Sequence, residues 1–290
     1  MKYLYRQTLD FLLFSNVFIA LCAVAQGLVT YQLLHAKPNM YVLSLLFCAT
    51  LAMYNYSILL SKPKNPENSR YRRVRWIFSH YRLIIFITAA AILGIFPLLF
   101  FLSPVSIVFL FFLAFISISY NLPVFTLKGR KFSLRNIPGI KLFLIALIWA
   151  LSCVLLPILQ LKSQSFNVST LDTLLLIAKR FLFVAAITVP FDIRDLYQDR
   201  TYELKTIPVV FGEKNAYLFC QFLLLLYLAL LFIFNKGFDL NYLGLAVVTL
   251  LTGWLIFKSN WERNEYYYFF YLDGTLMLQC VSVYMMQTLF

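Results

Sequence analysis

The sequence predicts an all-α, polytopic membrane protein built as a bundle of about nine transmembrane helices. Of its 290 residues, 62% are hydrophobic and 13% are charged, whereas soluble domains are about half apolar and a quarter charged. Apolar runs of membrane-spanning length recur from one end of the chain to the other. These runs are continuous rather than alternating, which excludes a porin-like β-barrel. We therefore expect residues 1–290 to form a single transmembrane helical domain.

The first apolar run, Phe11 to Leu33, is too long for a signal peptide and lacks a cleavage signal, so we interpret it as a span. The third and fourth spans are joined by a tight turn at Ser103 and Pro104, with no charged residue nearby. The predicted spans are 11–33, 40–60, 83–101, 104–122, 140–160, 171–191, 215–234, 240–257 and 266–288.

The basic residues predict the orientation of these spans. Twenty of the 25 lysines and arginines fall before the first span or in the loops that follow even-numbered spans. The positive-inside rule therefore places the N-terminus and the long basic loops in the cytoplasm, and the C-terminus on the outer side. This distribution also accounts for the net charge of +13 and argues against a nucleic-acid partner.

Some polar and reactive residues fall inside the apolar runs. Lys179 and Arg180 could line an internal cavity or could extend to the outer interface as snorkelling side chains. The fifteen residues from Arg180 to Asp195 span about 22 Å of helix, which favours snorkelling. The cysteines show no CxxC or Cys/His pairing and are interpreted as small buried side chains, neither disulfides nor zinc ligands: Cys22, Cys48, Cys153, Cys220 and Cys280.

Three carboxylates follow the sixth span at spacings of three and four: Asp192, Asp195 and Asp199. On a helix these spacings place all three on one face, where like charges repel unless a positive group lies among them. Mg²⁺ is a natural partner because it takes hard oxygen ligands and shares them with substrate phosphates. The alternative is a solvated helix end, neutralised by Arg194 and Arg200.

The aspartates and the residues after them resemble the second aspartate-rich motif of the UbiA-type intramembrane prenyltransferase superfamily. The resemblance rests on Asp192-x-x-Asp195-x-x-x-Asp199, followed by Lys205-Thr-Ile-Pro and Gly212. Two further stretches agree with the family pattern: Ser119-Tyr-Asn-Leu-Pro123 with Leu127-Lys128, and Ile137-Pro-Gly-Ile-Lys141 with Trp149. Nine spans with long cytoplasmic loops match as well, so the resemblance covers nearly the whole chain.

The resemblance implies a helical bundle around a central cavity that opens to the membrane and admits a polyprenyl diphosphate. It also implies Mg²⁺ as the cofactor, with Asp192, Asp195 and Asp199 as catalytic metal ligands. Ionisation of the diphosphate would give an allylic cation that attacks an aromatic or other lipid-soluble acceptor. Metal and basic residues would stabilise the leaving diphosphate, and a dry cavity would shield the cation from water.

The first aspartate motif departs from the family pattern. Asn55 stands at its first position, but the two acids expected four and eight residues later are replaced by Leu59 and Pro63, which cannot ligate a metal. Arginines in the following loop could cradle the diphosphate instead, since a guanidinium matches phosphate oxygens. The alternative is that these arginines only orient the protein in the membrane. They are Arg70, Arg72, Arg73 and Arg75.

We therefore expect a prenyltransferase, with a non-catalytic isoprenoid-binding or lipid-binding relative as the alternative, because the first motif is degenerate. A transporter has only the charges within spans in its favour. The expected partners are a polyprenyl diphosphate, a lipid-soluble acceptor and the lipid bilayer. The residues expected to bind the diphosphate are Asn55, Arg70, Arg72, Arg73, Lys128, Lys141, Arg194 and Lys205.

Overall fold

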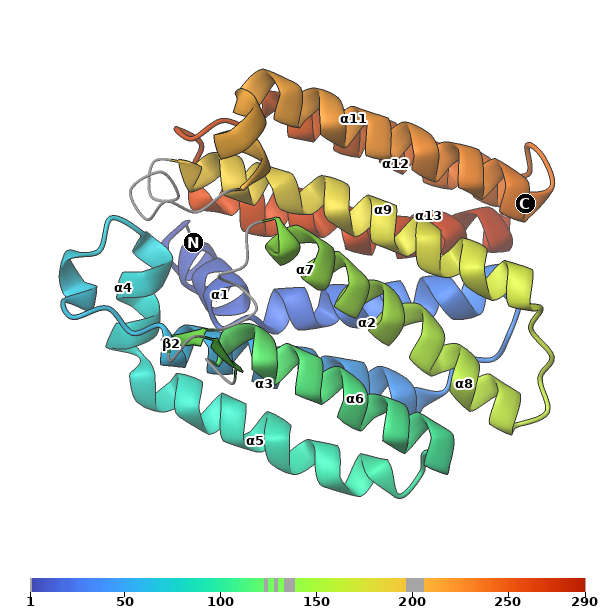
Figure 1. Ribbon diagram of the computed structural model, residues 1–290, viewed down its shortest axis with the longest axis horizontal. Coiled ribbons are helices and arrows are strands. Elements are labelled where there is room, and N and C mark those ends of the chain that lie inside the picture. The colour runs from blue at the N-terminus through green and yellow to red at the C-terminus, as the bar shows by residue number, and fades with distance from the viewer. Residues whose placement is uncertain (1, 123–124, 128–129, 133–138, 197–205, 290) are drawn as a thin grey trace.

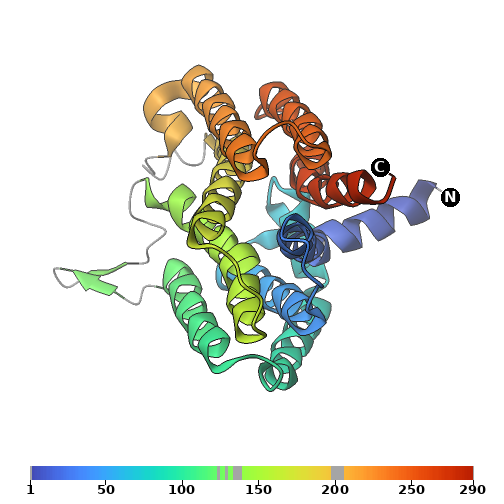
Figure 2. The same cartoon turned by 90° about the vertical axis from the view of Figure 1, so that its right-hand side faces the viewer.

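The computed structural model describes residues 2–122, 125–127, 130–132, 139–196 and 206–289. Its long helices lie side by side along the longest axis of the molecule (Figure 1), and Figure 2 views them nearly end-on. They are α2 (Val17–Leu33), α3 (Met40–Leu60), α5 (Tyr81–Leu99), α6 (Pro104–Asn121), α7 (Ile140–Ala150), α8 (Leu156–Ser163), α9 (Thr170–Arg194), α11 (Ile207–Asn235), α12 (Leu240–Lys258) and α13 (Asp273–Leu289).

Shorter elements connect or extend these helices. The strands pair as a small antiparallel hairpin, which projects from the rim of the bundle in Figure 2. The all-α prediction is confirmed for the bundle itself. The shorter elements are α1 (Lys2–Phe14), the 3-10 turn η1 (Pro66–Asn68), α4 (Arg72–Ser79), β1 (Phe125–Leu127), β2 (Arg130–Phe132), and the π-helical segments η3 (Leu151–Leu155) and η4 (Tyr267–Leu272).

Seven helical segments of the described chain are long and apolar enough to cross a membrane, which supports an integral membrane protein. The α1 and α2 helices pass the same test only when taken together, and the chain bends by 65° between them. The shorter apolar helix α6 corresponds to the remaining predicted span. The seven are 40–60, 81–99, 140–163, 170–194, 207–235, 240–258 and 267–289.

The first predicted span, 11–33, is broken near its N-terminal end. The chain turns at Asn16, whose φ of 65° is left-handed, a conformation that asparagine tolerates better than most residues. The Asn16 side chain donates a hydrogen bond to Asn55 of α3 (2.7 Å), which holds the bend against the bundle. As a result α1 leaves the bundle sideways, as Figure 2 shows.

Local sequence explains where other helices begin. Ser103 caps α6 by accepting a hydrogen bond from the Ser106 amide (3.2 Å), and Pro104 fits the first turn because its missing N–H has no helical partner there. Gly139 precedes α7 with a φ of 75°, and Gly212 interrupts α11 with a φ of 80°. Glycine adopts these conformations without a Cβ clash, which explains the glycine after the Thr-Ile-Pro stretch.

Lys179 and Arg180 are buried between helices, so the snorkelling interpretation is wrong. Arg180 donates a hydrogen bond to the backbone carbonyl of Gln26 in α2 (2.9 Å). The Lys179 ammonium lies 3.8 Å from the ring centroid of Phe234 in α11. Through these contacts Arg180 connects α9 to α2, and Lys179 connects α9 to α11, in the half of the bundle that lies away from the aspartates.

Candidate active site

The aspartate row begins where α9 ends. Asp192 lies in the last turn of α9 and is buried, and the Lys141 ammonium at the start of α7 lies 2.6 Å from its carboxylate. Gly139 sets the direction in which α7 leaves its loop and so brings Lys141 to α9. This contact brings together Lys141 and Asp192, two residues that the sequence predicts to belong to one site. Asp199 lies outside the described residues, as do Lys128 and Lys205.

Asp195 caps the end of α9 and is held by two partners. The Arg194 guanidinium donates two hydrogen bonds to its two carboxylate oxygens (2.8 and 2.9 Å), and the Tyr71 hydroxyl donates a third (3.1 Å). Burial alone would raise the pKa of Asp195, but the hydrogen bonds and charge of Arg194 outweigh it, so the pKa is lowered. Asp195 is therefore a carboxylate at neutral pH.

Aromatic rings surround the Arg194 guanidinium on several sides. Its central carbon lies 5.3 to 5.7 Å from the ring centroids of four residues, a geometry that favours a cation. Such an environment holds the positive charge in place next to the carboxylates. The four rings belong to Tyr71, Phe191, Tyr268 and Phe269.

The side chain of Arg73 extends from the basic loop into the bundle. Its guanidinium donates to Asn16 (2.5 Å), which in turn donates to Asn55 (2.7 Å), and it lies 4.4 Å from the ring centroid of Phe269. Burial and the nearby charge of Arg194 together lower the pKa of Arg73 to about 10, so Arg73 remains protonated at neutral pH. Asn55, the first residue of the degenerate motif, thus positions an arginine through Asn16.

These side chains line one cavity of about 240 Å³. Among the described residues, the cavity brings together three cations and three carboxylates, contributed by α4, α7, the end of α9 and the start of α13. Hydrophobic and aromatic side chains from α2, α3, α9 and η4 complete its wall. The charged residues are Arg73, Lys141, Arg194, Asp192, Asp195 and Asp273.

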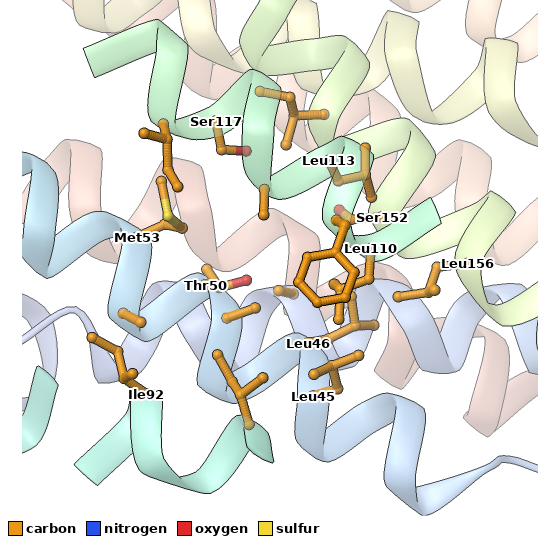
Figure 3. Close-up of a pocket in the computed structure, with 18 of the residues that line it drawn as sticks. Leu45, Leu46, Thr50, Met53, Ile92, Leu110, Leu113, Ser117, Ser152 and Leu156 are labelled. Atoms are coloured by element: carbon orange, nitrogen blue, oxygen red, sulfur yellow. The ribbon is translucent and has the colours of Figure 1, made fainter. Parts of the chain in front are cut away.

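A second cavity of about 460 Å³ is almost entirely apolar and lies between α2, α3, α5, α6, α7, η3 and α8. Figure 3 shows its wall, where Leu45, Leu46 and Leu110 lie among other apolar side chains and Thr50 and Ser117 are isolated polar ones. Tyr54 and Trp149 line both cavities, and the Trp149 indole donates a hydrogen bond to the Tyr54 hydroxyl (3.3 Å). The two cavities therefore share one wall.

Other predicted residues lie away from the polar cavity. Arg72 pairs with Asp10 and lines a separate surface pocket, and Arg70 is exposed, 6.0 Å from the ring centroid of Trp261. Leu59 packs against an apolar cluster that contains Ile77 and Ile84. Among the arginines predicted to bind the diphosphate in the basic loop, only Arg73 lines the cavity, because α4 directs its neighbours elsewhere.

Three residues at the site, Asp273, Asn16 and Tyr71, are not among those that the sequence predicts. A signal was available for Asp273, because it is the lone acid in the last apolar run and charges within spans are usually functional. Asn16 and Tyr71 carry no comparable sequence signal, since both become site residues only through the packing of α2, α4 and α9.

The carboxylates fit one divalent cation. Asp192 and Asp195 offer hard oxygen atoms on one wall of the cavity, and Mg²⁺ is usually held by one or two carboxylates together with substrate phosphates. Across the described ranges, no three His, Cys, Asp or Glu side chains form a complete metal site. At the first motif, Arg73 bonds to Asn16 and Asn16 bonds to Asn55, and none of these three side chains offers a carboxylate to a second ion.

No family model and no curated protein matches the chain in sequence. Solved structures do match in fold. A UbiA homologue from Aeropyrum pernix K1 has a TM-score of 0.68 at 14% identity, over 92% of this chain and 98% of that one. A UbiA homologue from Archaeoglobus fulgidus, bound to GPP and Mg²⁺, has a TM-score of 0.62 at 13% identity, over 96% and 99%.

A third structure, of a digeranylgeranylglyceryl phosphate synthase in membranes, has a TM-score of 0.55 at 14% identity and covers 96% of this chain and 99% of that one. Each match extends over nearly the whole length of both chains, so the similarity is not confined to a few helices. The chain therefore has the fold of the UbiA homologues, as the resemblance of its motifs predicts.

Proposed function

We propose that the protein is a UbiA-type prenyltransferase that moves a prenyl group from a polyprenyl diphosphate to an aromatic or other lipid-soluble acceptor. The observation that carries this proposal is the pair of adjoining cavities. One is polar and holds three cations and three carboxylates from the described part of the chain, and the other is apolar and large enough for a prenyl chain. Such a pair matches a molecule with a charged head and a hydrocarbon tail.

In this arrangement the diphosphate occupies the polar cavity and the chain extends past Tyr54 and Trp149 into the apolar one. Arg73, Lys141 and Arg194 supply fixed positive charge where negative charge develops as the allylic C–O bond breaks. The apolar wall excludes water, which would otherwise capture the cation. The structures of a UbiA homologue from Archaeoglobus fulgidus bound to GPP and Mg²⁺, and to DMAPP and Mg²⁺, support this assignment of donor and cofactor.

When bound, Mg²⁺ would supply Lewis-acid stabilisation of the leaving diphosphate. Asp192 and Asp195 would hold it, with Asp199 as the proposed third ligand. Lys141 and Arg194, now paired with those carboxylates, could then turn toward the diphosphate oxygens. Lys128 and Lys205 remain proposed diphosphate contacts. We also propose that residues 1–290 act as one domain, with the aspartates facing the cytoplasm and the C-terminus outside.

A direct test measures turnover of a radiolabelled prenyl diphosphate by the purified protein, with Mg²⁺ and with EDTA. Mass spectrometry of co-purified lipids identifies candidate acceptors. A Mg²⁺-dependent labelled lipid supports the transferase. The degenerate first motif supports one alternative, a non-catalytic isoprenoid-binding relative, and tight donor binding without turnover under any metal condition would establish that alternative instead.

A further inference from the structure

Asp273 is an acid that the diphosphate site does not require. It is the first residue of α13 and follows the π-helical segment η4, a kind of irregularity that often marks functional positions. Its side chain lines the polar cavity near Phe18 and Leu276, and the residue is only 9% exposed. A carboxylate at this depth in a span is costly to retain unless it serves a function.

The bonding of Asp273 differs from that of the other two acids in the cavity. Asp192 is paired with Lys141, and Asp195 is bonded to Arg194 and Tyr71. Among the described residues, the charges of Arg73 and Arg194 act on the Asp273 carboxylate, but no side chain or backbone amide donates a hydrogen bond to it. A buried carboxylate with unused acceptor capacity can accept a hydrogen bond, and then a proton, from a bound molecule.

We propose that Asp273 is the catalytic base that takes up the proton lost by the acceptor during prenyl transfer. This inference rests on the proposed function and adds a residue and an acceptor class to it. The allylic C–O bond breaks and its electron pair leaves with the diphosphate. The nucleophilic atom of the acceptor forms the new bond to the prenyl carbon, and its proton passes to an Asp273 oxygen.

The charges in the cavity also define the acceptor. The three cations balance the three carboxylates, and a diphosphate with its metal adds further charge at the α9 end of the cavity. Among the described residues of the cavity, no cation is in excess of the carboxylates, so Asp273 would repel an acceptor that has its own carboxylate. The acceptor is therefore an uncharged hydroxyl compound, whose O–H group donates to Asp273.

The test compares the wild type with Asp273→Asn and Asp273→Glu in membranes from expressing cells, supplied with radiolabelled geranylgeranyl diphosphate and Mg²⁺. Asparagine keeps the size of the side chain but cannot take up the proton. We expect kcat for labelled lipid to fall roughly 10²-fold or more in Asp273→Asn. Donor Kd should stay within about twofold, because a general base acts after donor binding. Asp273→Glu should regain part of the rate.

Asp172→Asn removes an acid at the opposite end of α9 and serves as the matched control, with wild-type turnover expected. Wild-type turnover in Asp273→Asn overturns the inference, as does a loss of donor affinity as large as the loss of rate. A labelled product that carries a carboxylate overturns the acceptor class. If the wild type itself binds the donor but forms no product, the proposed transferase fails, and this inference fails with it.

Discussion

Arg73 offers the sharpest test of how the degenerate first motif works. Arg73 lies beside Asn16 and Asn55, at the wall where the first motif would otherwise hold a metal. If its guanidinium binds the diphosphate directly, Arg73→Gln removes a charge-assisted hydrogen bond while keeping a donor for Asn16. Hydrogen bonds to charged groups contribute about 1.5–3 kcal/mol. Since about 1.4 kcal/mol changes an equilibrium tenfold, Kd for geranyl diphosphate should rise roughly tenfold to a hundredfold.

The matched control is Arg72→Gln, one residue away on α4. Arg72 pairs with Asp10 outside the polar cavity, so its loss should leave Kd nearly unchanged. Arg73→Lys keeps the charge without the planar fork and should give an intermediate loss. Binding is measured by isothermal titration on protein in lipid nanodiscs, with thermal midpoints to verify folding. Wild-type affinity in Arg73→Gln, or equal losses in both glutamine variants, would refute the direct role.

Two further variants test neighbouring parts of the site. Lys141→Met should raise KM for the prenyl diphosphate by roughly tenfold, because a positive charge is lost from the site. Membrane insertion should not change, as judged by protease accessibility of the loops. An unchanged KM in correctly inserted protein would mean that Lys141 only helps to orient the protein in the membrane. The double variant Leu59→Asp with Pro63→Asp restores the acids of the first motif. Turnover should fall, because the new carboxylates should pair with nearby cations and disturb the apolar cluster around Ile77. A large gain in turnover would instead reveal a damaged two-metal site.

The sequence was sufficient to predict the helical membrane fold and most of the spans, because long apolar runs and loop charges are strong signals. It was also sufficient to place Asp192, Asp195 and Lys141 in one site through their motifs. The bend at Asn16 was not predicted, since Asn16 is fixed by Asn55 of a different helix. Contacts of this kind, between residues far apart in the sequence, produce no periodic pattern from which they could be predicted.

The sequence could not show which of the basic residues lines the polar cavity, for a similar reason. Arg70, Arg72 and Arg73 are near neighbours with the same chemistry, and only the orientation of α4 directs one of them into the cavity. The pairing of Lys141 with Asp192 likewise depends on how α7 packs against α9. Asp273 could have been singled out as a lone acid in an apolar run, although its place opposite the aspartate row requires the fold.

The central claim, that the polar cavity binds a prenyl diphosphate through metal-bearing aspartates, is tested most directly by donor binding with and without metal. Geranyl diphosphate is titrated into the wild type and Asp195→Asn, each with Mg²⁺ and with EDTA. We expect EDTA to weaken wild-type binding at least about tenfold, because charge-assisted contacts are lost. Asp195→Asn should bind weakly and respond little to EDTA. Tight binding that is indifferent to both EDTA and the substitution would contradict the account.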